Sequence, residues 1–398
     1  MKASDDRILT THVGSLPRSP ELLRMLEEIE RDGDVNRDAF ESKVVADLEQ
    51  VVRNQLDVGI DVGGDGELPR IGFSSYVKDR VAGFGGVSTR GGMTDYEKFP
   101  RWAEMMVGDS AVGGEQPSES STTYALPMAQ EKIRYDPDRA AAKEELAWFA
   151  GALDAAPARF AETFVTAASP GIISTTLLRS EDNAAYANDR EYLADICAEM
   201  RAEYELIVER GHVLQIDAPD LAFERQIMFR DRPLSEFLER VRLHVEVLNE
   251  AISNIPRDRV RMHVCWGNWN GPHIDDVELE PLLPYLYEAQ VAGISMAGAN
   301  PLHAHDFKLF ASYPLPEHMV LLPGVIDVTH NYLEHPEVVA DRICAYADVV
   351  GDPSRIIAST DCGFGTFAGL QLVAEDVTWK KLERLAEGAQ IASERLGK

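Results

Sequence analysis

Eight short apolar runs alternate with longer amphipathic stretches along the 398-residue chain, and this alternation limits the possible folds more than any other feature. The apolar runs cover residues 7–13, 58–64, 160–167, 213–217, 259–265, 291–296, 319–326 and 355–361. Helical patterns between them include residues 35–57, 187–210, 234–254, 277–290, 336–350 and 376–396. Short apolar runs separated by helices are typical of parallel β/α units. Eight units predict an α/β fold, a single closed (β/α)8 TIM barrel.

Residues 85–125 interrupt this pattern after the second predicted strand. They are rich in Gly, Ser and Pro and contain few apolar positions, which predicts a long inserted loop. Loops of this length inside a domain often cover a site, so we expect either a lid or a plain surface excursion. No linker or repeat divides the chain, and we predict one catalytic domain over residues 1–398.

The charge balance narrows the classes of partner. The chain has 39 Lys and Arg against 67 Asp and Glu, a formal net charge of −28. A surplus of negative charge argues against nucleic-acid and anionic-membrane partners, which need basic patches. The N-terminus has no apolar signal core, and the four cysteines are too few and scattered for a disulfide framework. These features predict a soluble cytoplasmic protein with reduced thiols, and they leave a homo-oligomer open.

Three residues at strand ends form a candidate metal site. His263 and Cys265 are two positions apart, so they face the same side of one strand, and Cys362 follows the last predicted strand. All strand ends of a barrel face one mouth, which brings the three together. One imidazole and two thiolates suit Zn2+, with a fourth position open for a substrate thiol. A buried Cys and a hydrogen-bonded His would be the structural alternative for the first pair.

Further polar residues fall at other predicted strand ends, where each alone could be a cap or turn residue. They are Gly14, Ser15, Glu67, Asp217, Asp327, Thr329, His330 and Tyr332. Their convergence on one rim favours a ligand site.

The motifs THVGSLPR, GDGELPR, LQIDAPDL, HVCWGN, LLPGVID and TDCGFGT together resemble the catalytic domain of cobalamin-independent methionine synthase. Its single-domain relatives include the epoxyalkane:coenzyme M transferases. The resemblance covers nearly the whole chain and implies a (β/α)8 barrel whose zinc activates a thiol for alkyl transfer. It implies zinc ligation by His263, Cys265 and Cys362. It also implies a thiol-substrate pocket made by Val13, Gly14, Ser15, Glu67 and Asp217.

The chain departs from the methionine synthases at two positions near that site. Ala297 stands where they place a further zinc-ligating Glu. Asp327 opens the loop that holds their proton-handling His, but Thr329 occupies the expected His position and His330 comes one residue later. We therefore expect Asp327, His330 and Tyr332 to include the group that handles the proton. The chain also lacks the N-terminal half of the two-domain methionine synthases.

Two thiol alkylations fit these residues. We slightly favour ring opening of an epoxide by coenzyme M, with homocysteine methylation as the alternative. The reason is Ala297, because a strained epoxide needs a less electron-rich sulfur than a methylated amine does. Glu67 and Asp217 favour methylation of homocysteine, because two carboxylates would repel the sulfonate of coenzyme M. The alternative of another class is a small-molecule binding protein of the uroporphyrinogen decarboxylase type.

Overall fold

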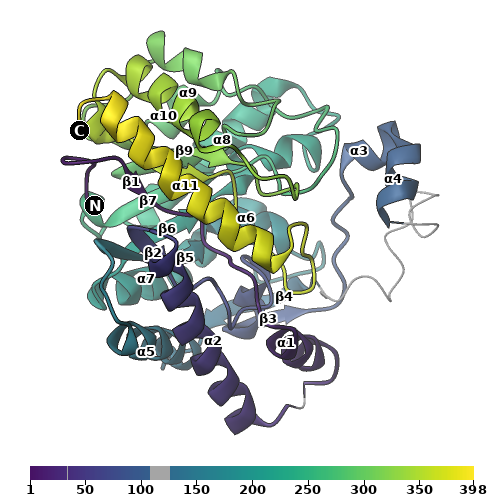
Figure 1. The fold of residues 1–398 in the computed structure, drawn as a ribbon. Coiled ribbons are helices and arrows are strands. Elements are labelled where there is room, and N and C mark those ends of the chain that lie inside the picture. The colour runs from purple at the N-terminus through teal and green to yellow at the C-terminus, as the bar shows by residue number, and fades with distance from the viewer. Residues whose placement is uncertain (34, 108–125) are drawn as a thin grey trace.

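The computed structural model describes residues 1–33, 35–107 and 126–398, and its centre is a ring of eight parallel strands (Figure 1). The strands are β1 (Leu9–Thr10), β2 (Val62–Gly64), β5 (Glu162–Ala168), β6 (Val213–Asp217), β7 (Val260–Val264), β8 (Gly293–Met296), β9 (Val320–Ile326) and β10 (Ile357–Thr360). Each strand pairs with the next one along the chain, except that β1 pairs with β10 and contacts β2 through a single parallel bridge between Thr11 and Val62. The α/β barrel predicted from the alternation is confirmed.

Helices cover the outside of the ring. They are α1 (Pro20–Asp32), α2 (Arg37–Asp57), α5 (Ala140–Ala155), α6 (Pro170–Thr176), α7 (Asp189–Glu209), α8 (Leu234–Ala251), α9 (Leu283–Leu286), α10 (Pro336–Val350) and α11 (Glu375–Arg395). Short 3-10 helices cover Ser75–Asp79, Pro219–Leu221, Phe223–Gln226, Arg257–Arg259, Asp306–Ala311 and Pro353–Arg355. Local signals set several helix ends. The Asn188 side chain accepts from the Glu191 amide at the start of α7, and Gly351 ends α10 in the left-handed conformation.

The helix predicted over residues 277–290 is wrong for most of its length. Only Leu283–Leu286 is α-helical. Pro281 and Pro284 explain this difference, because each lacks an amide hydrogen and its ring clashes with the preceding turn of a helix. The leucines of this stretch are nevertheless buried. The spacing of apolar residues therefore predicted correctly which side chains pack into the core, but not the length of the helix.

The segment after the second strand is more structured than expected. An antiparallel hairpin of β3 (Val81–Gly85) and β4 (Met128–Tyr135) brackets it. Two short helices, α3 (Thr94–Lys98) and α4 (Pro100–Val107), replace part of the predicted loop and project from the barrel (Figure 1). The remaining part of the proposed lid, 108–125, lies outside the described residues.

The register of the ring places polar side chains in one layer. Asp217 at the end of β6 pairs with His263 on β7, and His263 pairs with Ser295 on β8. The two ends of the chain also meet, since Lys398 Nζ donates to the Ser4 carbonyl at 2.9 Å. Within the described ranges, the helices are too short or too polar for any of them to traverse a lipid bilayer.

Candidate metal centre and substrate pocket

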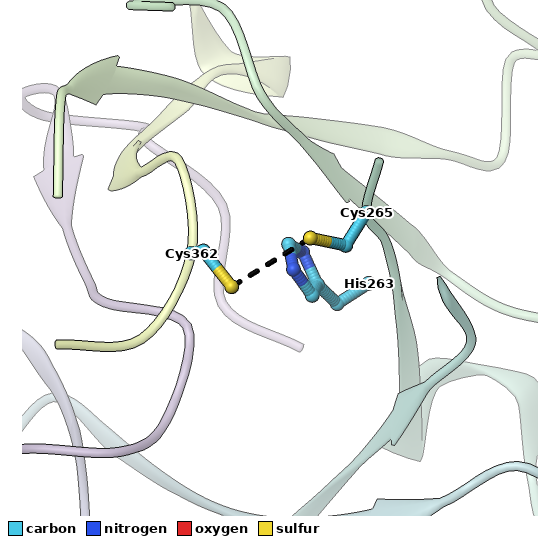
Figure 2. A group of neighbouring side chains, drawn as sticks. All are labelled: His263, Cys265 and Cys362. Carbon is cyan, nitrogen blue, oxygen red and sulfur yellow. Dashed lines mark hydrogen bonds between the residues drawn. The ribbon is translucent and has the colours of Figure 1, made fainter. Parts of the chain in front are cut away.

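Three ligand-type side chains meet at the carboxyl ends of β7 and β10. His263 belongs to β7, Cys265 follows that strand directly, and Cys362 follows the end of β10. All three are buried, and their ligand atoms lie within 4.8 Å of one another. Figure 2 shows them pointing toward a common point from two sides of the barrel. The structure therefore brings together the three residues that the strand-end pattern predicts.

The imidazole of His263 has one engaged nitrogen and one open nitrogen. Nδ1 lies 3.3 Å from the Ser295 hydroxyl on the neighbouring strand. Nε2 is buried and has no hydrogen-bond partner in the described part of the chain. A buried polar atom without a partner is unfavourable, and histidine ligands of metals characteristically hydrogen-bond through their second nitrogen. Nε2 is thus the nitrogen of His263 that could hold a metal ion.

The two thiols form a reduced pair. Their sulfur atoms are 3.7 Å apart, far beyond the length of a disulfide bond, and both cysteines are free. The contact with the Cys362 thiol, together with the nearby His263 imidazole, lowers the pKa of the Cys265 thiol well below its ordinary value, and the Gly267 amide donates to its sulfur at 3.2 Å. The pKa of Cys362 is raised because Cys265 and burial disfavour a second thiolate. One imidazole and two thiols of this kind fit zinc.

Glu67 and Asp217 form an acidic pair beside this set. Both are fully buried, and the charge of Asp217 disfavours ionisation of Glu67. Burial and Asp217 raise the pKa of Glu67 to about 8, and burial raises the pKa of Asp217 to about 6. Glu67 Oε1 accepts from Thr166 Oγ1 at 3.1 Å, whereas Oε2 is buried with no partner among the residues described. The unpartnered oxygen fits a cationic ligand group.

The turn of Val13, Gly14 and Ser15 packs closely around these groups. A Cβ atom at position 14 would collide with Glu67 Oε1, so only glycine allows this approach. The Val13 carbonyl accepts a hydrogen bond from Gln215 Nε2. Ser15 hydrogen-bonds through its carbonyl to the Phe364 amide at 2.8 Å, which ties the turn to the loop of Cys362. These contacts put the predicted thiol-substrate residues next to the predicted ligands.

Cys265 and Cys362 also line a pocket that lies apart from Glu67 and Asp217. The pocket has an empty volume of about 330 Å³ and is lined by Cys265, Trp266, Gly267, Asn268, His273, Ala297, Asn300, His303, Asp327, Val328, Thr329, Asp361 and Cys362. Ala297 thus faces the space next to both cysteines. Its methyl group is small and carries no metal-binding atom.

Of the three residues predicted to handle a proton, only Asp327 lines this pocket. Asp327 lines the pocket and lies 3.2 Å from His330 Nδ1. The side chains of His330 and Tyr332 are 41% and 51% exposed, and they stack at 5.4 Å between ring centroids without lining the pocket. Burial is the main cause that raises the pKa of Tyr332 to about 12.

Two buried groups at the pocket were missed from the sequence. Asp361 accepts from the amides of residues 298–300 at 2.7–2.9 Å, which fixes the loop that begins at Ala297. Burial, together with nearby Asp327, raises its pKa to about 6. His303 lies between Asp276 and Asp306, whose hydrogen bonds outweigh burial and raise its pKa to about 9. Adjacency to Cys362 was the only signal for Asp361, and His303 had none because its partners come from separate loops.

Comparisons with known proteins identify relatives of this chain. Residues 8–133 match the family model described as the catalytic domain of cobalamin-independent synthase. The methionine synthase of Sulfurisphaera tokodaii is 26% identical over 396 residues, covering 97% of this chain and 93% of the relative. The methionine synthase of Saccharolobus solfataricus is 25% identical over 97% of this chain and 95% of its own length. The chain is thus similar to methionine synthases over nearly its whole length, and its first third matches the family model.

Solved structures of methionine synthases share the fold. A B12-independent methionine synthase from Shewanella sp. W3-18-1, solved in complex with selenomethionine, superposes with a TM-score of 0.70 at 18% identity, covering 98% of this chain and 99% of that one. A putative vitamin-B12 independent methionine synthase from Listeria monocytogenes gives a TM-score of 0.59 at 16% identity, covering 97% and 98%. At these identities the likeness supports the barrel alone.

Proposed function

We propose that this chain is a zinc-dependent methyltransferase that methylates the thiol of homocysteine. The observation that carries the proposal is the buried acidic pair, Glu67 and Asp217, beside the His263, Cys265 and Cys362 set. Homocysteine has a thiol for the metal and an ammonium group for the carboxylates. The unpartnered Oε2 of Glu67 is a ready acceptor for that ammonium. The names of the archaeal relatives, methionine synthase, support the same substrate.

The acidic pair also disfavours coenzyme M, because Asp217, whose pKa is about 6, is ionised at neutral pH and repels a sulfonate. Two cations could in principle offset this repulsion, and both are engaged. Arg18 donates to the backbone carbonyls of Leu68, Gly365, Glu67 and Arg70. Arg70 forms an ion pair with Glu145 at 3.0 Å and donates to Thr166. Both guanidinium groups therefore stabilise the fold around the pair and do not serve an incoming sulfonate.

His263 Nε2 and the sulfur atoms of Cys265 and Cys362 would hold the zinc ion. When bound, zinc supplies the charge that lowers the pKa of the incoming thiol and makes it a nucleophile at neutral pH. Ser295 orients the His263 ring, and Gly267 fixes the Cys265 sulfur. Glu67 and Asp217 would hold the ammonium and so orient the substrate thiol toward His263, Cys265 and Cys362.

The transfer itself needs a proton for the leaving group. The homocysteine sulfur attacks the methyl carbon of a methylated amine, and the C–N bond breaks with its electron pair going to nitrogen, which then takes up a proton. We assign the role of proton donor to His330, whose Nδ1 faces the Asp327 carboxylate. Asp327 also accepts from the His330 amide at 2.9 Å, and Tyr332 stacks on the ring. A half-exposed histidine held by a carboxylate can exchange its proton with solvent between turnovers.

One observation favours the second candidate, opening of an epoxide by coenzyme M. Ala297 lines the pocket where methionine synthases have a carboxylate ligand, and a site with one less negative charge suits a more reactive electrophile. The acidic pair and the relatives weigh against it, so we place it second.

The two candidates are separated by one experiment. Zinc-loaded protein is incubated with homocysteine plus methyltetrahydrofolate, and separately with coenzyme M plus epoxypropane, while loss of free thiol and the product mass are followed. We expect methionine from the first pair only. Cys265→Ala should abolish the reaction, whereas the matched Cys197→Ala, a buried cysteine on α7 away from the site, should retain it. Product from the second pair alone would reverse the order of the candidates.

A further inference from the structure

Arg261 is a buried cation inside the barrel for which the proposed reaction has no role. Its side chain is among the largest that are completely enclosed, and its guanidinium carbon lies 3.7 Å from the centroid of the Phe164 ring. Its hydrogen bonds go to neutral oxygens, namely Gln215 Oε1 at 2.8 Å, Thr11 Oγ1 at 3.1 Å and the His12 carbonyl at 3.0 Å. None of these hydrogen bonds goes to a carboxylate, and burial lowers the pKa of Arg261 to about 9, although the charges of Glu162 and Asp217 act in the opposite direction. Burying a charge in this way is unfavourable, which suggests a purpose beyond stability.

The contact with Gln215 decides how that amide is oriented. A guanidinium group only donates hydrogen bonds, so the amide oxygen of Gln215 must face Arg261. The amide nitrogen must then face the opposite direction. There it donates to Asp217 Oδ1 at 2.8 Å and to the Val13 carbonyl. Both acceptors belong to the thiol-substrate pocket.

This orientation also determines which oxygen of Asp217 is available. Oδ1 is held by the Gln215 amide, whereas Oδ2 has no hydrogen bond within the described part of the chain. The Val13 turn lies against Glu67 through Gly14. One amide group therefore connects the two halves of the acidic pocket, and a reversed amide would put its oxygen against a carboxylate and a carbonyl.

We propose that Arg261 and Gln215 are positioning residues for the amino group of the substrate: Arg261 fixes the Gln215 amide, and Gln215 fixes Asp217 and the Val13 turn so that Asp217 Oδ2 faces the ammonium. This inference rests on the proposed function, since it assumes a thiol that carries an ammonium group. It predicts a selective effect. Removing either residue weakens recognition of the amino group and leaves recognition of the thiol intact.

The test compares two thiols that differ only in the amino group, L-homocysteine and 4-mercaptobutanoate, by calorimetric binding to the zinc-loaded protein. The variants are Arg261→Met and Gln215→Met, and thermal melting reports whether they fold. We expect each variant to bind homocysteine about tenfold more weakly, as the loss of one hydrogen bond to a charged group predicts, with unchanged affinity for 4-mercaptobutanoate. Gln215→Glu, which places an oxygen against Asp217, should have at least as large an effect and serves if a methionine variant does not fold.

Arg355→Met is the matched control. Arg355 also donates to neutral carbonyls, those of Leu315, Pro316 and Met319, but it precedes β10 at the opposite end of the strands. The Arg355→Met substitution should reduce the melting temperature and leave the ratio of the affinities for L-homocysteine and 4-mercaptobutanoate unchanged. Equal weakening of both thiols, or none, in the site variants would overturn the inference. A wild-type protein that does not distinguish the two thiols would overturn the proposed function as well.

Discussion

Ser295 Oγ lies 3.3 Å from His263 Nδ1, on the strand next to the one that carries the histidine. The two residues pair directly in the register of β7 and β8, so the contact is set by the sheet and not by a loop. Supporting hydrogen bonds of this kind orient a metal-binding imidazole and raise its basicity.

Ser295→Ala should therefore weaken zinc binding about tenfold, the lower end of the usual effect of such supporting contacts, without unfolding the barrel. Competition with a chromophoric chelator measures the affinity. The control is Ser359→Ala, because the Ser359 hydroxyl is buried on β10 without a hydrogen-bond partner in the described structure. Equal zinc affinities in the two variants would show that Ser295 does not act on the histidine.

Cys265→Ala should lose most of its zinc, since two remaining ligands bind the ion weakly. Metal analysis after dialysis should give close to one zinc per wild-type chain and only a small fraction for the variant. Cys344→Ala, at a half-buried position on α10, should keep the wild-type content. Full zinc occupancy in Cys265→Ala would refute the ligand assignment.

The pH dependence of stability should report Glu67. Burial and Asp217 raise its pKa from 4.5 to about 8 in the folded chain. A carboxyl with a raised pKa stabilises the fold at pH values below its unfolded pKa, and this contribution is lost as the pH rises through about 8. The melting temperature of the zinc-free protein should thus fall between about pH 5 and about pH 9. Glu67→Gln should flatten this fall, whereas the exposed Glu97→Gln should not, and an unchanged slope in Glu67→Gln would rule out this cause.

Ala297→Glu should add a fourth protein ligand, because the side chain enters the pocket shared by Cys265 and Cys362. We expect zinc to be held at least tenfold more tightly, as a fourth ligand completes a closed tetrahedral site, and homocysteine to bind more weakly because the new carboxylate competes for its position. Ala297→Gln has the same size without the charge and is the control. If zinc affinity does not differ between the two, the position is too far from the metal.

The barrel could be predicted because its strands are encoded locally. Each of the eight apolar runs overlaps a strand of the ring, and β6 begins and ends where the pattern indicates. The approach of His263, Cys265 and Cys362 could also be predicted, since strand ends of a barrel share one mouth. The barrel and the approach of these three residues can both be derived from the local spacing of apolar residues and from the rule that the carboxyl ends of barrel strands lie at one end.

Other features depend on contacts that no local pattern encodes. The helices at 94–107 are held by contacts with a distant loop, such as the hydrogen bond from the Trp269 indole to Asp95 at 3.1 Å. The charged state of His303 needs Asp276 from another loop. The orientation of Gln215 requires Arg261, which the sequence presents only as a charge within a buried strand.

Cys265 and Cys362 are separated by 97 positions, and the second lies beyond the last strand of the ring. During synthesis, a chain emerging from the ribosome presents the two β7 ligands long before the third. Because β10 must insert between β9 and β1 before Cys362 reaches them, the nascent chain has no competent site until the ring is complete. A metal ion held by these three residues would therefore enter only after the ring is complete, and it would tie the last strand to the middle of the barrel.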